Sequence, residues 1–272
     1  MPSKKTNKKQ RTSTTDALEV TFSPSKVAKH LKNFYLRSGC KPTLSKDERD
    51  EMNDKEKKAY RSIVVPSVGG GKYVFLAVVE KFLTYLFQRT LKTVKVDKKT
   101  GDKVVNVLNL RQALADDTTL ASYFLAPINR YSKGTDYSKV TCGEAKDFEA
   151  VLRTVDKGAE LSKDAWNLVY FLTDWTFNDV AFASLKLLRV GTSSTISEKI
   201  ARLAVEATFD GPLFNDTSFT KLVMDETERI VEKADELKKS ADKGSKKTKK
   251  KSKKSTEDNS GDESGDESGD ES

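Results

Sequence analysis

The sequence contains very little cysteine and histidine. Its 272 residues include two cysteines, Cys40 and Cys142, and one histidine, His30. This scarcity excludes a disulfide scaffold and a zinc ribbon, both of which need more sulfur or imidazole ligands, and it favours a reducing compartment. We expect both cysteines to be free thiols. His30 lies among lysines, so we expect it to be exposed or to contact a phosphate.

A long uninterrupted apolar run is also missing. The most apolar stretch, residues 73–87, contains Glu80 and Lys81 and is too short to span a bilayer. The first residues are rich in Lys and Thr and include no apolar segment, unlike a secretory signal. These absences predict a soluble intracellular protein with no membrane partner.

Charge is concentrated at the two ends of the chain. The first fifteen residues carry +5, residues 238–254 carry +9 and residues 255–272 carry −8, which leaves +2 of the net +8 for residues 16–237. Segments this polar cannot offset the entropy lost on ordering. We therefore predict a disordered basic tail at 1–16 and a disordered tail at 238–272. The second tail is Lys-rich and then acidic, which is typical of a nucleic-acid arm with an acidic counterweight or of a solubilising tail.

Helical periodicity dominates the first half of the segment between the tails. Ser23 followed by Pro24 is typical of a helix start, with Ser as N-cap and Pro in the first turn. The elements expected after this helix are a polar insert at 45–61 (an exposed loop or short helix), a long apolar helix over 73–94, a short strand at 104–107 and a short helix over 108–115. The long helix is apolar around most of its circumference, so it must be buried on several sides.

The second half repeats this order of elements. We expect a short helix over 148–155, a long helix over 165–188 capped by Ser162, a loop at 191–197, a short helix over 198–208 and an amphipathic helix from 219 to about 237. The fold class is therefore all-α, with units at 17–125 and 142–237 joined by a linker at 126–141.

Neither unit can bury its two-sided long helix alone, so we expect the units to pack together. The predicted pairing core consists of Phe75, Val79, Leu83 and Phe87 from the first long helix and Trp166, Val169, Leu172 and Trp175 from the second.

The two units resemble core histones. The first is similar to histone 2A in LEVTFSPSKV (18–27), in VGGG (68–71) followed by VFLAVVEKFLTYLF (74–87), in DKKT (97–100) with Val104-Val105, and in LRQALADD (110–117). The second is similar to histone 2B over 151–195, and FTKLVMDETERIV (219–231) resembles the extra C-terminal helix of that family. The chain thus resembles a core histone doublet, similar to the fused histones of giant viruses.

The resemblance implies two histone folds paired in a handshake within one chain. It implies a protein that binds double-stranded DNA without sequence specificity and wraps it into nucleosome-like particles with a second histone 3/4-like pair or doublet. The resemblance also implies that the chain is part of a nucleoprotein. If the source is viral, this nucleoprotein is expected in the virion and in the infected-cell nucleus or viral factory; otherwise it is expected in the nucleus or chromosome.

The DNA contacts that the resemblance implies come from the paired first helices and from the loops. The matching positions are Lys26, Lys29, Lys32, Lys72, Lys103, Arg153, Ser162, Lys163, Ser194 and Thr195. Family arginine positions hold Ser67, Lys103 and Ser193 here, so we expect weaker and more salt-sensitive wrapping. The acidic patch of the family is reduced to Asp116, Asp117 and Glu226.

Two other functions fit the same residues. One is a regulatory histone-fold pair of the transcription-factor type, and the other is a histone chaperone that uses the acidic terminus. The Gly-rich segment before Lys72 is not a phosphate loop, because Tyr73 follows where Ser or Thr is required. With no nucleophile–base pair in the sequence, we expect no catalytic residues, metal, cofactor or small-molecule substrate.

Overall fold

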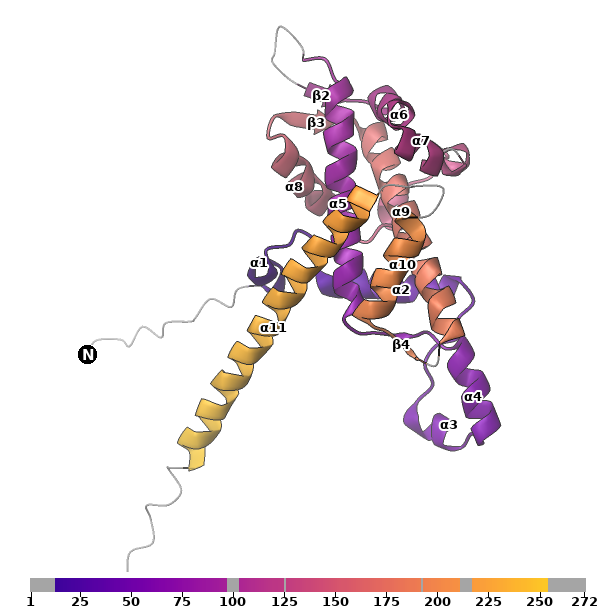
Figure 1. Ribbon diagram of the computed structural model, residues 1–272, viewed down its shortest axis with the longest axis vertical. Helices are drawn as coiled ribbons and strands as arrows, with labels where there is room; N and C mark the ends of the chain where they lie inside the picture. Colours follow the sequence, from indigo (N-terminus) through magenta and orange to yellow (C-terminus); the bar gives the residue numbers. More distant parts are fainter. Residues whose placement is uncertain (1–12, 97–102, 125, 192, 211–216, 254–272) are drawn as a thin grey trace, which may run out of the picture. The chain divides into compact units, whose positions relative to one another are not determined.

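The computed structural model describes residues 13–96, 103–124, 126–191, 193–210 and 217–253. In this part of the chain the fold is mostly helical, with eleven α-helices and four strands of two or three residues (Figure 1), which confirms the all-α class. No described helix combines the length and the apolar character needed to cross a membrane. The described residues up to Val231 belong to one compact unit and those from Glu232 onward to a second. Residues 1–12 and 254–272 of the predicted tails lie outside the described residues.

The first half contains more helices than the sequence predicts. Its elements are α1 (Thr14–Leu18), α2 (Pro24–Arg37), α3 (Lys46–Asp50), α4 (Asp54–Ile63), β1 (Ser67–Val68), α5 (Gly71–Thr93), β2 (Lys103–Val105), α6 (Val107–Asp116) and α7 (Thr118–Phe124). The polar insert forms both α3 and α4, each begun by a capping box. Ser23 occupies the N-cap position of α2, but its hydroxyl bonds Ser25 Oγ at 2.8 Å rather than a backbone N–H.

Helix α1 corrects the predicted boundary of the N-terminal tail. Ser13 Oγ accepts the N–H of Asp16 at 3.1 Å, and Leu18 is 1% exposed. One buried apolar side chain and a capped first turn therefore order residues that composition alone assigns to a disordered tail.

In the second half the helices follow the predicted order with one extension, and two short strands and two 3₁₀ turns are present that the sequence does not predict. Its elements are the 3₁₀ turns η1 (Pro127–Arg130) and η2 (Tyr137–Lys139), then α8 (Ala145–Val155), β3 (Ala159–Leu161), α9 (Lys163–Val190), β4 (Thr195–Ile196), α10 (Glu198–Phe209) and α11 (Thr217–Lys253). Residues 238–253 are thus helical rather than disordered. Lys and Ala are good helix formers and no Pro occurs in 217–253, so α11 continues into the Lys-rich block.

The predicted linker is packed against the second long helix. The rings of Tyr131 and Tyr137 stack with centroids 5.6 Å apart, and both contact Phe171 of α9. Asn167 accepts the N–H of Tyr137 at 2.9 Å and donates to the carbonyl of Thr135 at 2.8 Å. The connection between the halves is therefore part of the folded structure.

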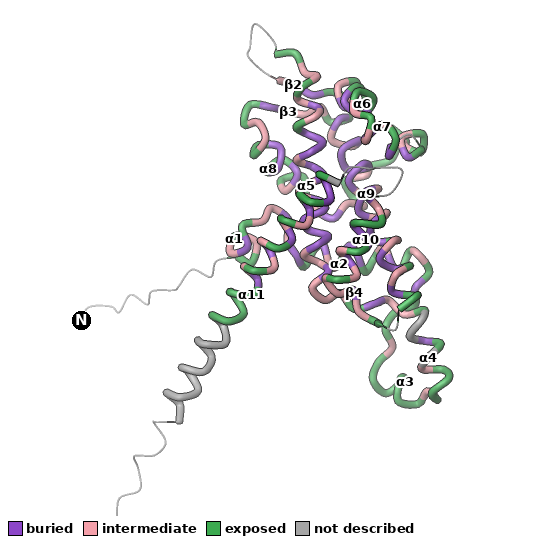
Figure 2. Tube along the Cα trace, in the orientation of Figure 1, coloured by how far each residue is buried: buried purple, intermediate pink, exposed green. Residues whose placement is uncertain are grey.

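The long helices α5 and α9 cross in antiparallel directions. The ring of Phe75 lies 5.0 Å from that of Phe177, and the ring of Phe87 lies 6.1 Å from that of Trp166, so later positions on α5 meet earlier positions on α9. Figure 2 shows buried positions along both helices. The buried members of the predicted core are Phe75, Val79, Leu83, Phe87, Val169 and Leu172. Trp166 and Trp175 are only partly buried, at the edge of this core.

Two short parallel strand pairs join the ends of the halves. β1 pairs with β4 through Ser67↔Thr195 and Val68↔Ile196, and β2 pairs with β3 over three residues. Each pair joins the segment before one long helix to the segment after the other, so the halves associate head to tail. Gly71 permits the first pair, because a Cβ there would lie 2.8 Å from the carbonyl oxygen of Ile196.

The prediction that His30 is exposed or contacts phosphate is wrong. His30 is 8% exposed, its Nε2 lies 3.0 Å from Asp174 Oδ1, and its ring lies 4.7 Å from that of Phe177. Val27, three residues earlier, shares the buried side of α2, which places His30 between the halves.

Both cysteines are free and buried, which confirms the prediction of unpaired thiols. Burial raises the pKa of the Cys142 thiol to about 12, so this thiol stays protonated at neutral pH.

We predict that Leu83→Asp unfolds the compact unit, whereas Leu108→Asp does not. Leu83 is fully buried in α5 and Leu108 is 75% exposed on α6. An unpaired carboxylate in place of a core leucine costs at least about 4 kcal/mol, a large share of a typical domain's stability. Thermal melts followed by far-UV circular dichroism measure the difference, and wild-type melting of Leu83→Asp would contradict the crossed-helix core.

Candidate nucleic-acid interface

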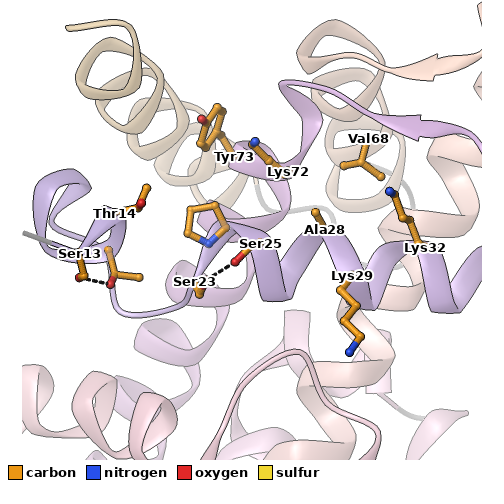
Figure 3. A pocket seen from close by; sticks show the side chains of 12 residues that line it. Ser13, Thr14, Ser23, Ser25, Ala28, Lys29, Lys32, Val68, Lys72 and Tyr73 are labelled. Carbon is orange, nitrogen blue, oxygen red and sulfur yellow. Dashed lines mark hydrogen bonds between the residues drawn. The ribbon is translucent and has the colours of Figure 1, made fainter. Parts of the chain in front are cut away.

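Three of the predicted DNA-binding lysines line one cavity. Lys29 and Lys32 come from α2 and Lys72 comes from α5, and the cavity has a volume of about 600 Å³. In Figure 3, Ser13 and Thr14 from the start of α1 lie on one side of Ser23 and Ser25, and the lysines of α2 lie on the other side. The remaining lining residues are Thr15, Pro24, Ala28, Val68 and Tyr73. We call this feature the lysine cavity.

Local sequence explains how the lysines reach the cavity. Lys29 and Lys32 are three residues apart on the exposed side of α2, opposite the buried Val27 and Leu31. Lys72 is in the first turn of α5, where its amino group lies 5.1 Å from the centre of the Tyr73 ring.

The lysine cavity has a surplus of positive charge. Among the residues that the structure describes, Lys29, Lys32 and Lys72 have no carboxylate within ion-pair distance. The N-terminal ends of α2 and α5 add partial positive charge, and the cavity also holds hydroxyl donors. These are the groups that bind phosphate oxygens without reading bases.

The predicted contacts at Ser194 and Thr195 lie beside this cavity. Val68 lines the cavity and belongs to β1, which pairs with β4. Ser67 donates its N–H to the Ser194 carbonyl at 3.1 Å, and its hydroxyl lies 2.6 Å from that of Thr195. The lysine cavity and the β1–β4 pair therefore form one continuous surface that contains five of the predicted residues.

Lys26 lies at a second surface, where the N-terminal ends of α2 and α8 meet. The rings of Phe22 and Phe148 contact each other there at 5.1 Å. Lys26 forms an ion pair with Glu144, and Lys146 lies 3.0 Å from the same carboxyl group. The hydrogen bond from Lys26, followed by that from Lys146, lowers the pKa of Glu144 to about 2. The charge of Lys26 is thus balanced within the protein.

The other predicted residues lie at the far end of α5. Lys103 of β2 lies 2.5 Å from Asp156 and lowers the pKa of that carboxyl group. Ser162 caps α9 by accepting the N–H of Ala165 at 3.3 Å, as predicted. Arg153 and Lys163 are exposed near this end. Since α5 has 23 residues, this third surface lies roughly 34 Å from the first.

The predicted acidic residues do not form an open acidic patch. Asp117 lies 2.9 Å from Arg89, and Asp116 accepts a hydrogen bond from Gln112 at 2.6 Å. Glu226 lies 2.8 Å from Lys81 and 2.5 Å from Arg229. Burial alone would raise the pKa of Glu226, but these two cations hold it below its usual value. Neighbouring cations thus balance the negative charges of Asp117 and Glu226, two of the three predicted residues.

Sequence reasoning missed the wall that α1 contributes to the lysine cavity. Ser13, Thr14 and Thr15 line the cavity, although composition places them in a disordered tail. The signal was Ser13 followed by Asp16, a pattern typical of a helix N-terminus.

Among the described residues, no group of three or more His, Cys, Asp or Glu side chains is arranged to hold a metal ion. A scan against protein-family models, a search of curated proteins and a search of solved structures each found no match to the chain. The fold and the surface chemistry are therefore the grounds for proposing a function.

We predict that Lys29→Ala/Lys32→Ala lowers the slope of log affinity against log salt by about two units, because each phosphate contact contributes about 0.9. Lys26→Ala alone should change the slope much less, since Lys26 is already paired with Glu144. Fluorescence anisotropy with a labelled random duplex across a salt series measures the slope.

The matched control for these variants is Lys46→Ala/Lys133→Ala, two exposed lysines outside the three surfaces. An unchanged slope in the Lys29/Lys32 variant would show that DNA lies elsewhere.

We also predict that Glu144→Gln strengthens DNA binding. The change leaves Lys26 and Lys146 without their shared carboxylate, so the slope should increase by about one to two units. Glu206→Gln makes the same charge change at an exposed position of α10 and should leave the slope nearly unchanged. Equal effects of the two variants would mean that net charge alone, and not the α2–α8 surface, sets the affinity.

Proposed function

We propose that this chain is a histone-doublet-like packaging protein that binds double-stranded DNA without sequence specificity. In this proposal it compacts DNA into nucleosome-like particles together with a second histone 3/4-like pair or doublet. It acts by binding rather than by catalysis. The observation that carries the proposal is the head-to-tail association of the halves, in which antiparallel long helices are joined at both ends by parallel strand pairs.

This association supports DNA binding because it combines elements from both halves into three surfaces. They are the β1–β4 pair with the lysine cavity, the α2–α8 ends and the β2–β3 pair. The outer two are roughly 34 Å apart, about the length of one duplex turn. A duplex running over all three would meet lysines, hydroxyls and helix N-termini, which contact the backbone and not the bases.

The charge distribution implies weak and salt-sensitive wrapping. The lysine cavity carries unpaired cations, whereas Lys26 and Lys103 at the other two surfaces are paired with carboxylates. The basic segments at 1–15 and 238–254, with +5 and +9, would then supply much of the sequence-independent attraction. A second pair would extend the DNA path beyond one chain.

The paired lysines also favour a second candidate function, a regulatory DNA binder. A chain that contacts DNA strongly only at the lysine cavity would hold a short site without wrapping it. The head-to-tail fold is compatible with both functions, and the length of protected DNA separates them.

We expect micrococcal nuclease digestion of the native nucleoprotein that contains this chain to yield a discrete protected fragment or a ladder. Either pattern requires repeating particles of fixed size. Naked DNA from the same preparation, digested in parallel, provides the control. A smear from both samples would contradict packaging and favour the regulatory function.

A further inference from the structure

Helix α1 is held in place by residues from two distant parts of the chain. Just after α1, Glu80 of α5 accepts the N–H groups of Thr21 and Phe22 at 2.5 and 3.1 Å. From α11, Arg229 donates to the carbonyl oxygens of Leu18 and Glu19 at 3.3 and 3.2 Å. Arg229 therefore occupies the C-terminal end of α1, where the last carbonyl groups of a helix need partners.

Arg229 is itself fixed by a short chain of ion pairs. Its Nη2 lies 2.5 Å and its Nε 3.0 Å from Glu226 Oε1, and Glu226 Oε2 lies 2.8 Å from Lys81. The planar guanidinium makes four hydrogen bonds here, two to Glu226 and one to each carbonyl group, whereas an ammonium group has three N–H donors and no fixed plane. The contact between α11 and α1 is thus directional.

Helix α1 needs this support. It has five residues, and a helix this short is not stable on its own. It is followed at once by Glu19, its C-cap residue, whose φ of 52° is a left-handed conformation that is unfavourable for a residue other than glycine. External contacts must therefore determine where α1 lies.

The position of α1 shapes the lysine cavity. Ser13, Thr14 and Thr15 line the cavity. Figure 3 shows Ser13 and Thr14 at the α1 end of the cavity, away from Lys29 and Lys32 of α2. If α1 moves away, the cavity loses these hydroxyl groups and its enclosure, while the lysines stay in place on α2 and α5. The same phosphate would then meet fewer donors and more water.

We propose that Arg229 is a positioning residue for phosphate binding in the lysine cavity: by holding α1, the C-terminal helix of the second half sets the wall of a site in the first half. The inference rests on the proposed function, since the ligand is a phosphate group of DNA. Arg229 acts through α1 and does not itself line the cavity.

The test compares Arg229→Ala with Arg202→Ala. Arg202 also joins α11 to its surroundings, since it lies 2.9 Å from Glu198 of α10 and 3.5 Å from Glu228 of α11. Its side chain contacts Glu198 of α10 and Met224 and Glu228 of α11, none of which belongs to α1. The two variants therefore remove similar ion pairs, and only one of them releases α1.

Two probes distinguish phosphate binding in the lysine cavity from DNA binding along the rest of the proposed path. Inorganic triphosphate is small enough for a cavity of about 600 Å³, and a random duplex covers the whole surface. We expect Arg229→Ala to weaken triphosphate binding by about fivefold to tenfold, as for the loss of one ordinary hydrogen bond in the cavity, and Arg202→Ala to change it less than twofold. Arg229→Ala should also weaken duplex binding more than Arg202→Ala does.

Hydrogen–deuterium exchange of residues 14–22 provides a readout that a general loss of stability would not reproduce. Exchange should be faster in Arg229→Ala than in Arg202→Ala, although the two variants melt at similar temperatures. Arg229→Lys should restore part of the affinity, because an ammonium group can reach one carbonyl but lacks the planar fork.

Equal triphosphate affinity and equal exchange in Arg229→Ala and Arg202→Ala would overturn the inference and leave the proposed function standing. Duplex binding by the wild type without any triphosphate binding would overturn the assignment of phosphate to the cavity. If the wild type bound neither probe, the proposed function would fail together with the inference.

Discussion

The structure depends on the mutual burial of two long helices. Along α5, every residue from Val74 to Val79 is at most 1% exposed, so no side of this segment faces water. A single half has too few helices to cover such a surface, whereas the crossing with α9 covers it from the second half. The two strand pairs follow from that crossing, because they join the ends of helices that already lie antiparallel.

The same association determines where charge accumulates. It brings Lys26 next to Glu144 and Lys103 next to Asp156, contacts between residues that are far apart in sequence. The lysine cavity is formed within the first half, and its cations have no such partner among the described residues. Positive charge is therefore concentrated at one of the three surfaces, although the sequence distributes lysines over all of them.

Much of the fold could be predicted from the sequence, because apolar periodicity over two turns or more identifies a buried helix. The prediction for His30 was wrong because lysines flank it in the sequence, whereas it lies on the same buried side of α2 as Val27. Composition predicts disorder for the first residues of α1, but one buried leucine and one N-cap hydrogen bond are enough to order this polar segment. The hydrogen bonds of Glu80 with Thr21, just after α1, and of Arg229 with Leu18 of α1 join residues about 60 and 210 positions apart, and no local pattern encodes them.

The packed connection between the halves has a consequence for assembly. Tyr131 and Tyr137 lie against Phe171, so the segment that joins the halves is not a loose hinge. Exchange of one half with another copy would therefore have to pivot on the few residues between Phe124 and Tyr131, and this short connection keeps the two halves of one chain close together. The two halves of each polypeptide then pair with each other in a reaction that is first order in protein, and dilution should not weaken this pairing.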